Sequence, residues 1–127
     1  MIIHPALVHF PIAFYLLEGF LLVLGRMRKN PSYDSFAYLV FNLALGFHAA
    51  AAVAGLYDAG WFAHLEGKTR THLISAVTLG TLSLFRWALW KKERKLGLAP
   101  STLLIASAGL SIGMTLITAW LGGELVY

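Results

Sequence analysis

Residues 102–121 read TLLIASAGLSIGMTLITAWL, and no charged side chain occurs between Thr102 and Gly123. A helix of about 20 predominantly apolar residues spans the hydrocarbon core of a bilayer. Three earlier segments have similar length and character, at about 6–25, 35–57 and 70–90. The pattern therefore predicts an all-α fold, a four-helix transmembrane bundle that forms a single domain over residues 1–127.

The composition supports a membrane protein and excludes several kinds of site. The chain is 58% hydrophobic and 13% charged, whereas soluble domains are about half apolar and a quarter charged. It has no cysteine, which excludes disulfides, thiolate metal sites, iron–sulfur clusters and covalent c-type haem. The net charge of +4 does not predict nucleic-acid binding, because the basic residues lie where membrane topology places them.

Basic residues are concentrated in two of the three predicted connections. Seven lie in the first and third connections and two lie near the second: Arg26, Arg28, Lys29, Lys91, Lys92, Arg94 and Lys95 against Lys68 and Arg70. The positive-inside rule then places both termini and the second connection on the extracytoplasmic side. Because no basic leader precedes the first apolar segment, we expect it to be a retained helix rather than a signal peptide.

Two histidines lie at the outer ends of predicted helices that run in the same direction. His9 is about four residues into the first helix and His72 about three into the third, so both rings should lie about 4–6 Å below the outer boundary. Equal depth suits the two axial ligands of a haem b. Four further residues would accommodate the porphyrin or meet its propionates: Ala13, Ala76, Arg70 and His4.

The same end of the chain fits a second chemistry. His4, His9, His72 and Asp58 could enclose a zinc, copper or iron ion, since imidazole and carboxylate suit these metals. His4 and His9 are about 140° apart on an ideal helix, so both reach one ion only if His4 lies outside the helix. A third interpretation is structural, in which the histidines form hydrogen bonds between helices or a proton relay.

His48 is predicted near the midplane, on a face of small residues. Met114 is predicted at a similar depth, so a second haem with His and Met ligands is one interpretation. The alternative is a packing histidine that bonds to a backbone carbonyl or a hydroxyl group.

Glu18 and Arg86 are charges within predicted spans, where an unpaired charge is costly. They could pair with each other. Alternatively, Glu18 could meet Asn42 or a neighbouring protein, and Arg86 could extend to lipid headgroups. The last segment contains Gly109-x-x-x-Gly113, a pattern that packs helices within a bundle or in a homodimer.

With these residues identified, the chain resembles the bacterial integral-membrane family known as domain-of-unknown-function family 2231. The resemblance covers most of the chain, and its opening motif is the most specific part. The matching residues are His4, Pro5, Val8, His9, Phe10 and Pro11, then Gly55 and Asp58, His72, Arg86, and a terminal Gly122, Gly123, Leu125, Val126 and Tyr127. The resemblance implies a four-helix protein of the bacterial inner membrane, and it implies no settled activity.

The leading functional expectation is a small haem b protein that transfers electrons between quinol, or a larger complex, and an extracytoplasmic carrier. The alternatives are a transition-metal-binding membrane protein and a non-catalytic accessory subunit of a larger complex. A hydrolase is not indicated, because no Ser-His-Asp spacing is evident and the chain has no cysteine nucleophile. We therefore expect an electron-transfer or binding subunit rather than a stand-alone enzyme.

Overall fold

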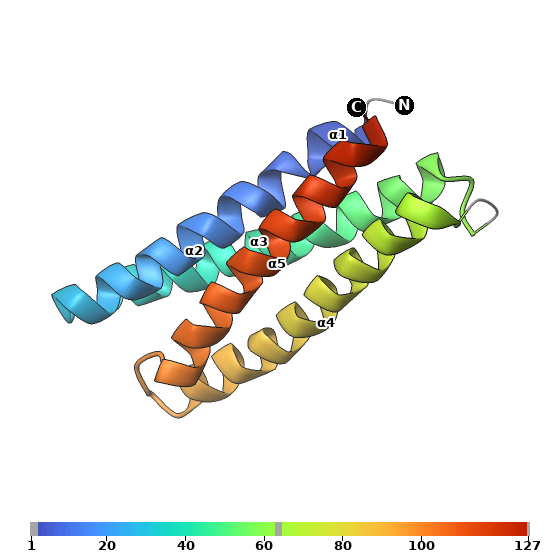
Figure 1. Ribbon diagram of the computed structural model, residues 1–127. Helices are drawn as coiled ribbons and strands as arrows, with labels where there is room; N and C mark the ends of the chain where they lie inside the picture. The colour runs from blue at the N-terminus through green and yellow to red at the C-terminus, as the bar shows by residue number, and fades with distance from the viewer. Residues whose placement is uncertain (1–2, 63–64, 127) are drawn as a thin grey trace.

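The computed structural model describes residues 3–62 and 65–126. Tyr127, from the terminal motif, lies outside them. Within the described residues the chain forms five helices: α1 (Ile3–Leu7), α2 (His9–Arg28), α3 (Pro31–Asp58), α4 (Gly67–Lys95) and α5 (Thr102–Val126) (Figure 1). Counting α1 and α2 together, four helical segments are long and apolar enough to cross a membrane. The all-α fold and the four predicted spans are confirmed, and each helix extends a few residues beyond the predicted apolar core.

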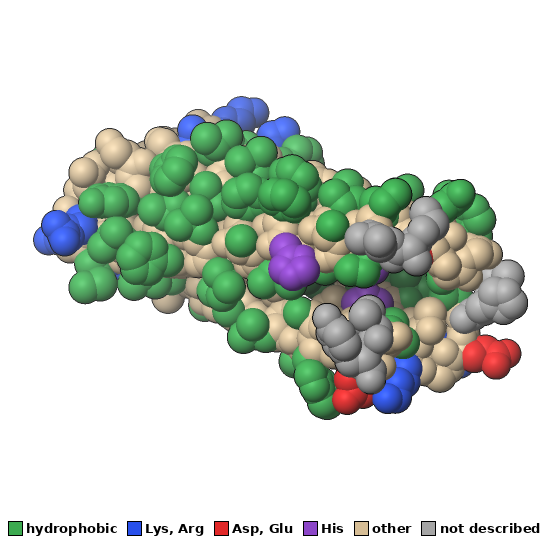
Figure 2. Space-filling view, turned by 90° about the horizontal axis from the view of Figure 1, so that it is seen from above, with side chains coloured by type: hydrophobic (Ala, Val, Ile, Leu, Met, Phe, Trp, Pro, Cys, Tyr) green, Lys and Arg blue, Asp and Glu red, His purple; other side chains and the backbone are tan. Residues whose placement is uncertain are grey.

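The helices pack as an up-and-down bundle. Helix α2 lies against α3 and α5, while α4 lies against α5 and, over a shorter stretch, against α3. We call the end where α1 and α4 begin and α5 ends the histidine end, and the end where α2 and α4 finish the basic end (Figure 1). Hydrophobic side chains cover much of the face seen in Figure 2, with charged groups towards its margins. Such a surface suits a bilayer.

Pro11 explains the short interruption between α1 and α2. Proline has no N–H, so the carbonyl of Leu7, four residues earlier, loses its usual helical donor. The interruption is confined to Val8, whose own N–H still donates to the carbonyl of His4 at 3.1 Å. His4 therefore lies inside a helical turn that continues the direction of α2.

Local capping fixes the reversals at the basic end. Lys29 adopts a left-handed conformation (φ 50°) after α2, and the Asn30 side chain accepts a hydrogen bond from the backbone N–H of Ser32 at 3.0 Å. At the other reversal, the buried carboxylate of Glu93 accepts from the backbone N–H of Ser101 at 2.6 Å and from its hydroxyl at 2.8 Å. These contacts connect the end of α4 to the start of α5.

The two halves of the bundle have different interiors. Between α2 and α3 the buried side chains are mainly apolar and include Leu22, Phe41 and Ala44. Along α4 and α5 the buried positions are largely polar: Ser75, Ser83, Arg86 and Glu93 on α4, and Ser107, Ser111 and Thr115 on α5. Lipid offers no hydrogen bonds, so such groups must pair within the protein.

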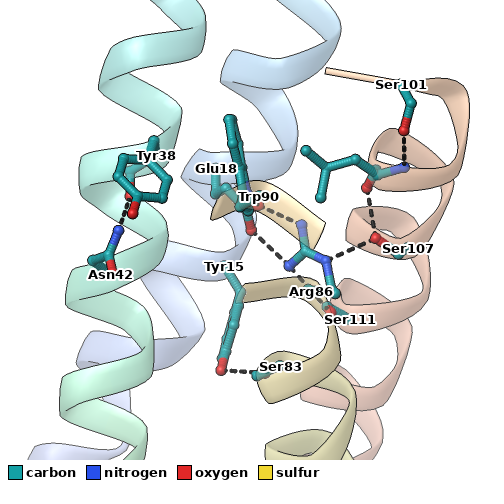
Figure 3. A network of polar contacts seen from close by, with 11 residues as sticks. Tyr15, Glu18, Tyr38, Asn42, Ser83, Arg86, Trp90, Ser101, Ser107 and Ser111 are labelled. Carbon is teal, nitrogen blue, oxygen red and sulfur yellow. Dashed lines mark hydrogen bonds and ion pairs between the residues drawn. The ribbon is translucent and has the colours of Figure 1, made fainter. Parts of the chain in front are cut away.

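Glu18 and Arg86 form an ion pair in the middle of this interior, as one of the sequence alternatives anticipated (Figure 3). Trp90 donates its indole N–H to the Glu18 carboxylate at 3.2 Å, and Arg86 also donates to Ser111 at 3.3 Å. Asn42 instead donates to the carbonyl of Tyr38 in its own helix. Arg86 is fully buried, so it does not extend to lipid headgroups.

The Gly109-x-x-x-Gly113 face does not pack within this bundle. Both glycines are exposed on α5, and no described atom lies within 4 Å of where a Cβ would stand on either. The pattern is thus left on the lipid-facing surface.

Candidate functional site

Two histidines from distant parts of the chain face each other at the histidine end. His4 lies in α1 and His72 lies in the second turn of α4, and both side chains are half-buried. Their ring centroids are 6.0 Å apart and the ring planes are inclined by 78°. The packing of α1 against α3, and of α4 against α5, brings them to one depth.

Each ring is held by a backbone carbonyl on a neighbouring helix. Nδ1 of His4 donates to the carbonyl of Ala51 on α3 at 2.7 Å, and Nδ1 of His72 donates to the carbonyl of Thr118 on α5 at 3.1 Å. A carbonyl only accepts, so Nδ1 carries the proton and the lone pair of each neutral ring is on Nε2. Among the described residues, no hydrogen bond uses Nε2 of either ring. The described contacts therefore engage Nδ1 of each ring and leave Nε2 without a hydrogen-bond partner in the protein.

Each ring also packs against a glycine. A carbon at the Cβ position of Gly55 would lie 2.8 Å from Cε1 of His4, and one at Gly122 would lie 2.9 Å from Cε1 of His72. We call Gly55 and Gly122 the seat glycines, because any larger residue there would displace the ring. The sequence marked both glycines as motif positions and Gly55 also as part of a small-residue face, but their contact with the rings depends on packing between helices.

A small cavity lies beside the two rings. It encloses about 60 Å³ and is lined by His4, His48 and His72, with Thr115 and Thr118 among otherwise mainly apolar side chains. A buried water needs about 10–15 Å³ of such space, so the cavity has room for a few waters.

His9 does not take the position that the sequence predicted for it. Its side chain is exposed, and its Nδ1 donates to the carbonyl of Pro5, one turn earlier, at 2.7 Å. His4 lies within helical α1 and faces the interior, so a residue five positions later points away from it. His4, not His9, stands opposite His72.

The other predicted partners also lie elsewhere. Asp58 is exposed and borders a separate open groove of about 570 Å³, beside Ile3 and Trp61, which no described histidine lines. Arg70 and Ala13 are exposed on the bundle surface, whereas Ala76 does line the histidine cavity. Across residues 3–62 and 65–126, no three His, Asp or Glu side chains gather closely enough to hold a metal ion. The predicted four-ligand set of His4, His9, Asp58 and His72 is therefore not assembled.

His48 is engaged at both ring nitrogens. Nε2 donates to the carbonyl of Ala76 at 3.2 Å, and Nδ1 accepts from the hydroxyl of Tyr15 at 3.1 Å. The Tyr15 oxygen in turn lies 2.7 Å from the hydroxyl of Ser83. Both ring nitrogens of His48 are therefore engaged, which leaves none for a second haem. Met114, the other predicted ligand, packs against the apolar core. The packing interpretation describes His48, and Tyr15 is the partner that sequence reasoning missed.

Comparison with known proteins identifies a family and nothing closer. A family model described as "Predicted membrane protein (DUF2231)" matches residues 1–127. Searches of curated proteins and of solved structures each returned no match.

Proposed function

The chain belongs to the DUF2231 family of predicted membrane proteins, and on that premise we propose that it binds a transition-metal ion between His4 and His72. One observation carries the proposal. Two imidazoles from different helices face each other, each fixed through Nδ1 by a backbone carbonyl, with Nε2 left for a ligand. An Nδ1–H bond to a carbonyl is the usual outer support of a metal-binding histidine.

The separation of the rings suits a shared ion. With a metal–nitrogen bond of about 2.0 Å on each side, and about 1.1 Å from each nitrogen to its ring centre, collinear imidazoles have centroids about 6.2 Å apart. The centroids of His4 and His72 are 6.0 Å apart. The inclination of the planes is no obstacle, because each ring can rotate about its own metal–nitrogen axis.

Haem b is the second candidate, because it also takes two axial imidazoles. Its porphyrin would have to lie between the two rings. The cavity there is about 60 Å³, whereas sites for molecules of cofactor size usually have about 300–1,000 Å³. The close packing supports a bare ion better than haem, and metal binding better than electron transfer to quinol.

The test uses asparagine in place of histidine. In His4→Asn and His72→Asn the amide N–H can stand in for Nδ1–H and keep the bond to the carbonyl, but no Nε2 remains. His9→Asn is the matched control, since His9 is exposed and bonded within its own helix. The full chain would be purified in mild detergent without chelators, then analysed for metal content and by oxidised and dithionite-reduced absorption spectra.

We expect about one metal ion per chain in the parent protein and in His9→Asn, and a loss of that ion in the other two variants. A Soret band lost in the same two variants would instead assign the pair to haem iron. A parent protein that holds neither metal nor haem, even after reconstitution, would exclude both candidates.

A further inference from the structure

We infer that the ion held by His4 and His72 is monovalent copper, bound by the two Nε2 atoms in a linear arrangement. This inference rests on the metal site proposed above and specifies the metal. It follows from the number and type of the donors and from the charge of the cavity walls.

Among the residues that the structure describes, the site offers two donors. No third His, Asp or Glu joins the pair within the described ranges 3–62 and 65–126. Zinc sites in proteins use three or four protein ligands in a tetrahedral arrangement, and magnesium, calcium and manganese prefer oxygen donors. Imidazole suits copper among other transition metals, and Cu(I), unlike Zn(II), forms stable complexes with two nitrogen ligands in a line.

The described cavity walls carry no negative charge. Apart from the imidazoles, the polar groups that line it are hydroxyls from Tyr15, Thr115 and Thr118. The Glu18 carboxylate is already paired with Arg86. The cost of placing an ion in such surroundings rises with the square of its charge, so a divalent ion costs about four times as much as a monovalent ion of equal radius. The walls therefore favour a monovalent ion.

The choice among monovalent ions follows from the donor atoms. A hard monovalent ion such as Na⁺ would meet nitrogen lone pairs where it prefers oxygen.

The experiment is an anaerobic titration of the full chain in detergent with Cu(I), in competition with the chromogenic chelator bicinchoninate. Zn(II), Co(II) and Ni(II) are titrated in parallel. We expect one Cu(I) per chain in the parent protein and in His9→Asn. Affinity should fall at least about 100-fold in His4→Asn and in His72→Asn, at or above the 10–100-fold typical of losing an outer support. X-ray absorption of the Cu(I)-loaded parent should show two nitrogen neighbours.

The outcomes separate this inference from the proposed function. Tighter binding of Zn(II), Co(II) or Ni(II) than of Cu(I), still lost in His4→Asn and His72→Asn, would overturn the copper assignment and leave the metal site. Absence of binding by every ion would overturn both. Equal Cu(I) affinity in all four proteins would place the copper elsewhere and overturn the inference. The X-ray measurement on the parent chain needs no variant, and three or four neighbours there would also overturn it.

Discussion

Arg86 on α4 donates through both terminal nitrogens to the carboxylate of Glu18 on α2, and neither side chain has any exposed surface. Its guanidinium lies over the ring of Phe41 on α3, 4.9 Å from the centroid, and its Nε donates to Ser107 on α5 at 2.9 Å. All four spanning segments of the described chain therefore meet at Arg86. The ion pair holds the bundle in register.

Glu18→Gln should destabilise the protein strongly. The change leaves the Arg86 guanidinium buried without a counter-charge, and breaking one partner of a buried pair typically costs about 3–5 kcal/mol. The measurement is the free energy of unfolding in mixed micelles with increasing dodecyl sulfate. Glu66→Gln, at the exposed start of α4, is the control and should change stability by less than about 0.5 kcal/mol. Similar losses in both variants would argue against a structural ion pair.

Removing both charges should cost less than the two single changes together. In Glu18→Met/Arg86→Met no charge remains buried, and apolar replacements of buried pairs are often tolerated. Some loss remains because Trp90, Ser107 and Ser111 lose partners. A double-mutant cycle should give a coupling of at least about 1 kcal/mol. Strict additivity would show that the two residues act independently.

Tyr15→Phe should cost about 1–3 kcal/mol of stability, because it leaves Nδ1 of His48 and the hydroxyl of Ser83 without their shared partner in a buried site. The fold should persist, since the ring is retained. The same micelle unfolding assay measures the loss. Tyr57→Phe, whose side chain is 58% exposed, should behave like the parent chain. An unchanged Tyr15→Phe would mean that water replaces the hydroxyl group.

Alanine at the seat glycines should weaken metal binding. Gly55→Ala or Gly122→Ala places a methyl group within 3 Å of a histidine ring, so the ring must move away from its partner. Affinity for the ion should fall at least about tenfold, in line with the loss of support for a ligand. Gly46→Ala on α3 and Gly113→Ala on α5 have open space at Cβ and should bind normally. Equal affinity in all four variants would contradict the seating of the rings.

Glu93→Ala should loosen the reversal between α4 and α5. Ser101 loses two hydrogen bonds to a buried carboxylate, at a cost of about 1–3 kcal/mol. Amide exchange should accelerate first at residues 96–104, around that reversal. Glu124→Ala is the comparison, because its ion pair with Lys68 is exposed and should contribute about 1 kcal/mol or less. Uniform acceleration along the chain would show that Glu93 supports the whole bundle instead.

The site was only partly predictable, and the reason is the phase of the first helix. The depth of a residue below the outer boundary follows from its number along the helix, so His9 and His72 were predicted at equal depth. Which side of the helix faces inward could not be read, because both sides carry apolar residues: Phe20 is 61% exposed while Leu22 is fully buried. Lipid and protein interior are equally apolar, so the usual contrast between faces is absent. Only packing showed that His4 faces inward and His9 faces outward.

The sequence by itself determined the number of spans, their approximate limits and the absence of thiol chemistry. The length of each apolar run, the positions of helix breakers and the composition are properties of the chain alone, and they decide whether a segment can span a bilayer. The tertiary structure decided which polar residues meet. Glu18 pairs with Arg86, His48 with Tyr15, and His4 stands opposite His72, since side chains on different helices become neighbours only through rotation and register. The histidine pair is therefore a product of packing, and the function proposed for it rests there.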